Sequence, residues 1–228
     1  MSLYAIGDLH LSLSSNKPMD VFGGKWENYV EKIKEGFSVL QSDDVTVLCG
    51  DVSWAMDLQE SLTDFKFIDA LPGRKIILKG NHDYWWNTMR KIQNFFDENS
   101  IHTVAILHNN CHFYDGVALC GTRGWFYEEE RHRDHDKKIM NRELMRLEMS
   151  LKAAGDSEKI CFLHYPPRFR DYVCGEVIEI MNRHGVKRCY YGHIHDAGHK
   201  FAIQGDVGGI TYKMVSGDYL NFHPEKIL

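Results

Sequence analysis

Short runs of consecutive apolar residues recur along the chain, and segments with helical periodicity lie between them. Runs of about four to eight apolar residues bounded by turn residues are typical of buried strands. Such runs occupy residues 3–6, 45–49, 75–78, 117–120, 159–163, 188–191 and 210–215. Helical patterns occupy residues 26–40, 57–71, 85–98 and 172–184. The strands read as continuous rather than alternating, so we predict an α/β fold whose sheets are covered on both faces.

One charged segment departs from this rhythm. Residues 128–138 are nearly all charged, and a helix with Met140, Leu144, Leu147 and Leu151 on one face is expected to follow. A charge run of this kind is usually a solvated loop next to a surface helix. The other interpretation is a cap over the active site, formed by the insertion and helix around residues 126–155. No second-domain boundary is visible, and we predict a single domain over residues 1–228.

Polar residues with metal-binding side chains follow several of the predicted strands. They are Asp8 and His10, Asp51, Asn81, His164, and the pair His193 and His195. In α/β folds the active groups gather at the carboxyl ends of the strands. Imidazole and carboxylate together suit Mn, Fe, Zn, Ni or Co better than Ca or Mg. The pattern therefore predicts a metal centre at these strand ends.

Each of these residues also has a purely structural interpretation. A lone buried histidine is more often a hydrogen-bonded core residue, and Asp8 or Asp51 alone is more often a turn residue or a helix N-cap. Asn81 and its neighbours could form only a turn. The structural interpretation does not explain why all seven residues of metal-binding type follow predicted strands, so we favour the metal centre. Of the other histidines, His199 is the least secure as a structural residue, because it lies close to His195.

Composition limits the classes of protein that this chain can belong to. Its 228 residues are 43% hydrophobic and 26% charged, as in ordinary globular proteins. The net charge of −5 disfavours a nucleic-acid partner. No apolar stretch is long enough to cross a membrane, and the first residues do not resemble a signal peptide. The six cysteines form no C-x-x-C pair, which favours a reduced, cytoplasmic protein.

Taken in order, the motifs resemble those of the calcineurin-like metallophosphoesterases, and the match runs from Asp8 to His195. The resemblance implies a four-layer α/β/β/α sandwich, in which two mixed sheets are flanked by helices and the metal site lies at the carboxyl ends of the strands. It implies two divalent metal ions as cofactors, drawn from Mn, Fe, Zn, Ni or Co, with Mn preferred in vitro.

The same resemblance implies a set of ligands. Asp8, His10 and His195 would hold one ion, Asn81, His164 and His193 would hold the other, and Asp51 would bridge the two. Two ions about 3.5–4 Å apart can generate a nucleophile and stabilise charge on a phosphoryl group. Only two of these ligands are carboxylates, so a net positive charge remains to attract a hydroxide and a phosphate.

The implied activity is hydrolysis of small phosphomonoesters or phosphodiesters, nucleotide-like esters among them, by attack of a metal-bound hydroxide. His82 is implied as a catalytic residue that binds neither ion and donates to the leaving oxygen or stabilises the phosphoryl charge. Asp83 either orients His82 and keeps it protonated or caps the next helix.

The chain departs from one branch of this family. The stretch after Asp51 lacks the Arg that protein serine/threonine phosphatases carry there, which disfavours a protein substrate. Arg123 is either a phosphate contact, through its bidentate fork, or a structural arginine. Trp54 follows a motif loop, as do Trp85, Trp86 and Trp125, and these rings either stack on a planar substrate group or pack the loops.

Two other functions stay open. A nuclease of the same family would need a basic groove for a strand, and the net charge offers little support for one. A non-catalytic metal-binding scaffold for protein interaction is expected to have lost ligands or the catalytic histidine, yet all these positions are filled. We therefore expect a small phosphoester as the partner, with no obligate protein partner.

Overall fold

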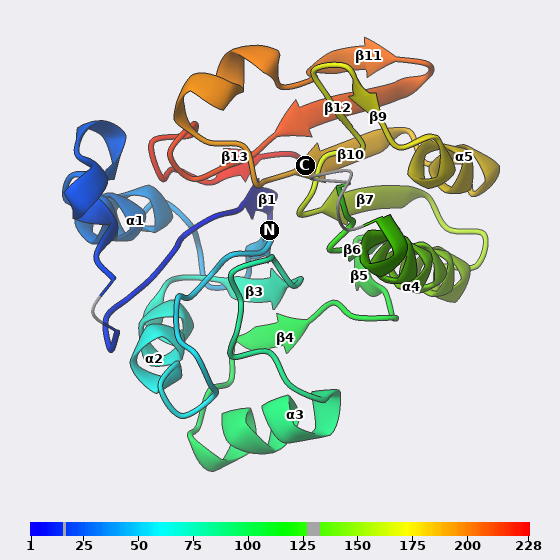
Figure 1. The fold of residues 1–228 in the computed structure, drawn as a ribbon. Coiled ribbons are helices and arrows are strands. Elements are labelled where there is room, and N and C mark those ends of the chain that lie inside the picture. Colours follow the sequence, from blue (N-terminus) through cyan, green and yellow to red (C-terminus); the bar gives the residue numbers. More distant parts are fainter. Residues whose placement is uncertain (16, 127–132) are drawn as a thin grey trace.

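A computed structural model describes residues 1–15, 17–126 and 133–228 of the chain. Two large β-sheets lie face to face in the middle of the molecule, and helices cover their outer faces (Figure 1). The first part of the predicted charged insertion, residues 128–132, lies outside the described residues. Whether a cap covers the active site therefore stays a prediction.

The first sheet has five strands in the order β13-β1-β2-β3-β4. Their bounds are Glu225–Lys226 for β13, Leu3–Ile6 for β1, Val45–Leu48 for β2, Arg74–Ile77 for β3 and Val104–Ile106 for β4. Strands β1 to β4 are parallel, and only β13 runs the other way. Ile6 pairs with Leu48 and Leu48 with Ile77, so these three strands end level with one another.

The second sheet has six strands in the order β11-β12-β10-β7-β6-β5. Their bounds are Gly205–Val207 for β11, Ile210–Met214 for β12, Arg188–Tyr191 for β10, Lys159–Leu163 for β7, Val117–Thr122 for β6 and His112–Tyr114 for β5. The four central strands are parallel and the two outer ones antiparallel. A separate small hairpin pairs β8 (Arg168–Phe169) with β9 (Tyr172–Val173).

Within the described part of the chain, three α-helices pack on the first sheet and two on the second. The first group is α1 (Tyr29–Phe37), α2 (Leu62–Ala70) and α3 (Met89–Glu98), and the second is α4 (Arg133–Ala153) and α5 (Gly175–Arg183). Short 3-10 helices are η1 (Met19–Phe22), η2 (Gly24–Trp26) and η4 (Asp196–Phe201). Within the described residues, no helix combines the length and apolar character that crossing a membrane requires.

The side chains of each strand alternate between two cores, because successive residues point to opposite faces of a sheet. In β7, Ile160 and Phe162 point into the core between the sheets, whereas Cys161 and Leu163 pack with α4 and α5. The first sheet has the same arrangement, with its outer core formed by α1, α2 and α3. Both faces of both sheets are therefore covered, which confirms the predicted four-layer sandwich.

The structure corrects the predicted ends of several helices. The helix predicted over 26–40 begins only at Tyr29, because Asn28 adopts a left-handed conformation with φ 53°. The helix predicted over 85–98 begins at Met89, where the Thr88 side chain accepts a hydrogen bond from the Lys91 amide. Local caps decide these ends, and an apolar pattern does not reveal them.

The sequence pattern also missed the short strands, and it misread one of them. Strands β4, β5, β11 and β13 lie at the edges of their sheets and have few fully buried residues. Residues 172–173, expected to open a helix, pair with β8 instead, and α5 starts at Gly175. By contrast, Met140, Leu147 and Leu151 are buried on one face of α4, as predicted.

Phe162 is the side chain that we expect to contribute most to the core between the sheets, because it is fully buried there. Phe162→Ala removes a ring that the two rigid sheets cannot collapse to replace, and should lower the free energy of unfolding by about 3–5 kcal/mol. Phe113→Ala, at a ring that is 59% exposed, is the matched control and should change it by less than about 0.5 kcal/mol. Equal midpoints in urea for the two variants would contradict this assignment.

Candidate metal centre

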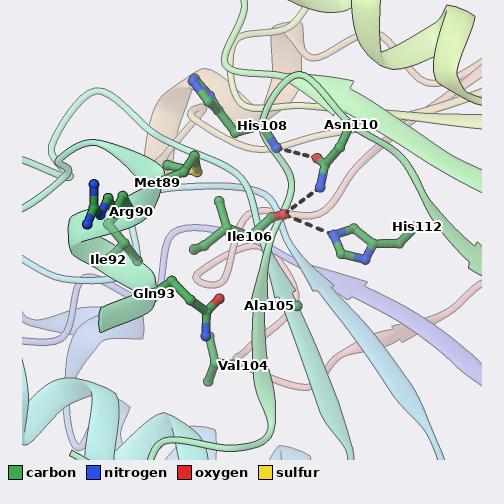
Figure 2. A pocket seen from close by; sticks show the side chains of 10 residues that line it. All are labelled: Met89, Arg90, Ile92, Gln93, Val104, Ala105, Ile106, His108, Asn110 and His112. Carbon is green, nitrogen blue, oxygen red and sulfur yellow. Dashed lines mark hydrogen bonds between the residues drawn. The ribbon is translucent and has the colours of Figure 1, made fainter. Parts of the chain in front are cut away.

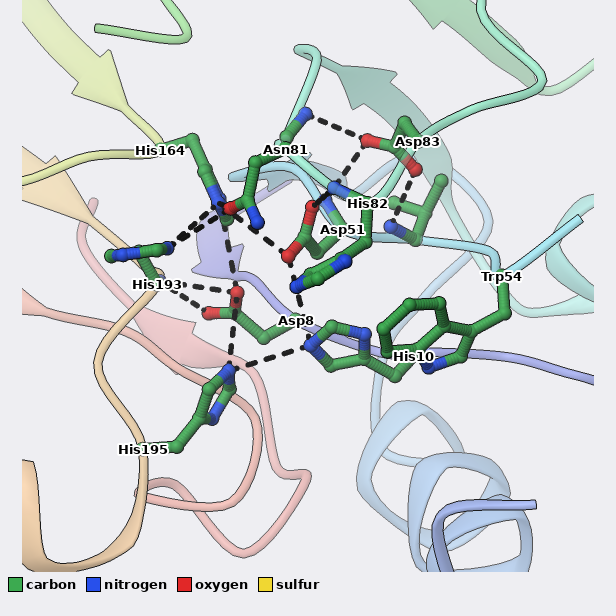
Figure 3. A network of polar contacts seen from close by, with 12 residues as sticks. Asp8, His10, Asp51, Trp54, Asn81, His82, Asp83, His164, His193 and His195 are labelled. Carbon is green, nitrogen blue, oxygen red and sulfur yellow. Dashed lines mark hydrogen bonds and ion pairs between the residues drawn. The ribbon is translucent and has the colours of Figure 1, made fainter. Parts of the chain in front are cut away.

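All seven predicted ligands come together where the carboxyl ends of the two sheets meet (Figure 3). Asp8, Asp51 and Asn81 follow β1, β2 and β3 of the first sheet. His164 follows β7 of the second sheet, and His193 and His195 follow β10. The level ends of neighbouring parallel strands thus gather residues that lie far apart in the sequence.

One group of donors consists of Asp8, His10 and His195. The Nε2 atom of His195 lies 3.4 Å from Nε2 of His10 and 3.7 Å from Oδ1 of Asp8. Three ligand atoms of this group lie within 4.8 Å of one another, which is close enough to share one ion. These three residues are the set that the family resemblance implies for one ion.

The second group surrounds the imidazole of His164. Its Nε2 atom lies 2.5 Å from Oδ1 of Asn81 and 3.5 Å from Oδ2 of Asp51. The Nδ1 atom of His193 lies 3.0 Å from the same Asn81 oxygen. Oδ2 of Asp51 is also 3.7 Å from Nε2 of His10, so this carboxylate lies between the two groups.

Hydrogen bonds on the far side of two imidazoles select the nitrogen that faces the centre. Nδ1 of His164 lies 3.0 Å from the Cys49 carbonyl, and Nδ1 of His195 lies 2.9 Å from Oδ1 of Asp218. In each case Nδ1–H is the donor, so Nε2 is the nitrogen that points toward the centre. Both rings therefore turn toward the centre the nitrogen that would bind a metal ion.

Asp218 is a residue of this site that the sequence reasoning missed. Its other carboxylate oxygen accepts from the Asp196 amide at 3.0 Å and lies 3.1 Å from Nε2 of His199. Asp218 is fully buried, so it aligns His195 rigidly. A signal was present, because Gly217-Asp218 follows β12 as Gly50-Asp51 follows β2. His199 thus contacts the residue that orients His195.

The backbone is strained at the points where it turns the donors inward. The backbone φ angle is 57° at Asp8, 46° at His10, 52° at Asp51 and 74° at His193. These values lie in the left-handed region, which residues other than glycine rarely adopt. Such strain persists only when the surrounding structure holds it, and it clusters at functional sites. Glycines make the close approach feasible: a Cβ on Gly192 would lie 2.5 Å from Oδ2 of Asp8.

Burial shifts the charge of the donor groups in a way that fits a bound cation. Burial raises the pKa of Asp8 to about 8 and that of Asp51 to about 6. Burial also lowers the pKa of His164 to about 3 and lowers those of His10 and His193. The imidazoles are therefore neutral, as ligands must be, and the two carboxylates lack sufficient countercharge from the protein.

His195 behaves differently from the other imidazoles. Burial acts to lower its pKa, but the hydrogen bond with Asp218 and the charge of Asp8 outweigh burial and raise it to about 9. In the protein alone, a proton on His195 thus compensates part of the negative charge. The donor set fits divalent metal ions. Such an ion would displace the proton from His195 and would compensate the negative charge of the carboxylates more fully than the proton does.

His82 lies beside the donor groups. Its amide donates to Oδ1 of Asp51 at 2.7 Å, and its Nδ1 lies 3.1 Å from the hydroxyl of Tyr84. The ring packs against Trp54 with 4.2 Å between centroids and lies 5.6 Å from the ring of His10. Burial lowers the pKa of His82, although the Asp51 charge acts to raise it.

Asp83 has partners other than those expected from the sequence. Its carboxylate accepts from the amides of Gly80 at 2.7 Å and Asp51 and Val52 at 2.9 Å, and from the Trp85 indole at 2.9 Å. Its described hydrogen bonds do not include the His82 ring, and the N-cap of α3 is Thr88. Asp83 therefore ties together the two loops that carry Asp51 and Asn81.

The predicted substrate contacts are spread around the centre. Nη2 of Arg123 lies 3.3 Å from Oε1 of Glu143 in α4, and its guanidinium covers the Trp125 ring at 4.7 Å. Arg123 therefore has structural partners, the Glu143 carboxylate and the Trp125 ring. Trp54 stacks on His10 at 5.1 Å, whereas Trp85 is buried in the core and therefore cannot stack on a substrate.

Aromatic rings also cover the opposite side of the centre. Tyr165 lies 4.2 Å from the His193 ring and Phe126 lies 5.5 Å from it, measured between centroids. A cavity of about 480 Å³ lies away from the metal centre, against α3 and β4 (Figure 2). There the side chains of Asn110 and His112 are both within hydrogen-bond distance of the Ile106 carbonyl, so their polar groups are already engaged.

Asp83→Asn tests whether this carboxylate holds the two loops together. An amide has one acceptor oxygen and points its NH₂ group at backbone donors, so the variant should lose about 2–4 kcal/mol of stability. It should also bind Mn²⁺ more weakly, because Asp51 loses its support. Asp57→Asn is the control, since this exposed carboxylate accepts from one described amide, that of Glu60. Unchanged stability and metal affinity in Asp83→Asn would refute the assignment.

Comparisons with known proteins were consistent with the fold. Two solved structures match over nearly the whole length of both chains. The AQ665 protein of unknown function from Aquifex aeolicus is 17% identical, with a TM-score of 0.53, and the match covers 99% of this chain and 95% of that one. The phosphopantetheinyl hydrolase PptH from Mycobacterium tuberculosis is 14% identical, with a TM-score of 0.58, covering 100% and 95%. Likeness at this level of identity shows the fold alone.

The sequence comparisons give a more specific result. No curated protein matches this chain significantly. A family model does match, and its match includes every donor of the centre described above, from Asp8 to His195. Since the model of the calcineurin-like phosphoesterases matches residues 1–197, the chain belongs to the calcineurin-like phosphoesterase family.

Proposed function

We propose that this protein is a metal-dependent phosphoesterase that hydrolyses small phosphomonoesters or phosphodiesters. Membership of the family supports phosphoester hydrolysis in general. The observation that carries the proposal is the convergence of imidazoles and two buried carboxylates on one spot, with His82 next to them. Six free cysteines support a reducing compartment, which we propose to be the cytoplasm.

The family uses dinuclear metal sites, and we assign the ligands of each ion from the donor groups. Asp8, His10 and His195 would hold one ion, Asn81, His164 and His193 the other, and Asp51 would bridge them. Two divalent ions would supply Lewis acidity toward the phosphoryl oxygens and make a water molecule nucleophilic at neutral pH. Mn²⁺ is our choice for the first assays, because carboxylate and imidazole ligands accept it.

The protein's own residues would position the ester and manage the proton of the leaving group. His82 is fixed by its amide, which donates to Asp51, and by the contacts of its ring with Trp54 and Tyr84. We propose that Nε2 of His82 faces the ester, since Nδ1 is engaged by the Tyr84 hydroxyl. Because burial lowers the pKa of His82, this residue would act as an acid only while the negative charge of a bound phosphoester stabilises its protonated form.

The alternatives make different demands on the same site. A nuclease of this family would cleave a single strand as readily as a small diester. A non-catalytic scaffold would bind metal without hydrolysing any ester. A panel of p-nitrophenyl phosphate, bis-(p-nitrophenyl) phosphate and a single-stranded oligonucleotide, assayed with Mn²⁺, therefore separates the three functions.

The response to metal should depend on pH in a defined direction. Asp8 and His195 carry protons in the metal-free protein, with pKa values raised to about 8 and about 9 from their ordinary 3.8 and 6.5. Their contribution to stability is complete below the ordinary values and is lost as pH rises through 8 and 9, so the chelated protein should lose stability between pH 6.5 and 9. Because an ion must displace the same protons, stabilisation by Mn²⁺ should grow over this range.

Thermal unfolding with and without Mn²⁺, followed across this pH range, measures both effects, and elemental analysis counts the ions. Asp51→Asn removes the charge between the two donor groups and should lose most of the metal response and the activity. Asp115→Asn, at an exposed turn, should keep both. One ion or none in an active, unchelated preparation would contradict the dinuclear assignment.

His82→Ala tests catalysis apart from metal binding. The variant should retain both ions, yet its kcat should fall by about 10²–10⁴-fold, the usual effect of a positioned acid–base group. The loss should be larger for an alkyl leaving group, which needs a proton, than for nitrophenolate. His193→Ala should lose metal and activity together, and His102→Ala, at an exposed histidine, should lose neither. If His82→Ala loses its ions, then His82 is a ligand and the assigned role is wrong.

A further inference from the structure

An apolar cavity of about 310 Å³ opens beside the metal centre, between η1 and the Trp54 side chain. It is lined by Lys17, Pro18, Met19, Val21, Phe22 and Trp54. Val21 and Phe22 are 74% and 70% exposed, although both side chains are large and apolar. Covering such side chains is favourable, and exposed apolar patches of this kind often mark binding sites.

Trp54 connects this cavity to the metal centre. One side of the indole stacks on the His10 ring at 5.1 Å with an interplanar angle of 26°, and the His82 ring is 4.2 Å away (Figure 3). The indole N–H donates to the Met19 sulfur at 3.3 Å, which fixes the ring against η1. Trp54 thus lines the cavity and also contacts the proposed ligand His10.

Lys17 adds a positive charge at the rim of the cavity. Its Nζ lies 5.4 Å from the Trp54 ring centre and 5.8 Å from that of Tyr84. Among the ion pairs that join described residues, none involves Lys17. The ammonium therefore attracts anions toward the side of the cavity that faces His82.

We propose that this cavity binds an apolar alkyl or aryl group attached to the phosphoester, so that the enzyme prefers esters that carry such a group. The inference rests on the proposed function and adds a substrate class to it. The Trp54 ring is already contacted by His10, His82 and Lys17, so the apolar surface left open is chiefly that of Val21 and Phe22. An apolar tail covers this surface better than a nucleobase, which would need a free indole face.

Binding of alkylphosphonates to the Mn²⁺-loaded protein tests this proposal without relying on hydrolysis. Calorimetry on the series from methyl- to hexylphosphonate should show affinity rising about threefold to fourfold per methylene group, as expected for apolar burial. In the double variant Val21→Ser and Phe22→Ser this rise should flatten. The matched double variant Val39→Ser and Phe113→Ser changes side chains that are 68% and 59% exposed elsewhere, and should retain the rise.

Each outcome of this experiment decides a specific point. Equal affinity along the series in the unchanged protein would overturn the apolar site, as would a rise that the Val21→Ser and Phe22→Ser changes do not alter. Hydrolysis of ethyl and hexyl phosphate is then measured separately. A rising affinity without hydrolysis of either ester under any metal would refute the proposed function but not the apolar site. Hydrolysis of both esters with a flat affinity series would refute the apolar site alone.

Discussion

Two carboxylates, Asp8 and Asp51, are buried together at the junction of the two sheets, and the charge of this pair constrains the rest of the site. A buried carboxylate without a partner is costly, so it takes up a proton or a cation. Burial accordingly raises the pKa values of both groups, while it keeps His10, His164 and His193 neutral. A site of this composition is more stable with a divalent cation than without one.

The surrounding fold supplies the rigidity that such a site needs. Left-handed backbone at Asp8, Asp51 and His193 turns the donors inward at a cost in strain. Asp83 offsets part of this cost by accepting several amide hydrogen bonds from the two loops of the first sheet. On the second sheet, Asp218 holds His195 in place by accepting a hydrogen bond from its imidazole. The donors are therefore held in place before any ion arrives, which is what tight and selective binding requires.

The two sides of the centre offer different surfaces to an ester. Trp54 and η1 form an open apolar wall on the side of His10, with Lys17 at its rim, whereas Tyr165 and Phe126 cover the side of His193. Strand ends carry the donors, and the loops and 3-10 helices around them carry these walls. The donors at the strand ends thus account for the reaction class, and we expect the selection of a substrate to depend on the side chains of these loops.

The sequence by itself predicted an α/β fold with covered sheets and a metal centre at the strand ends, and its family resemblance implied the four layers and the ligands of each ion. Runs of buried residues predicted the central strands, and polar residues after those runs predicted a metal centre whose members meet because parallel strands end level. It did not determine the helix starts at Tyr29 and Met89, since single caps and turns decide them. Only the tertiary structure decided the partners of Asp83, the part played by Asp218 and the apolar wall next to Trp54. These features depend on contacts between segments far apart in the chain, and no local pattern of apolar and polar residues encodes such distances.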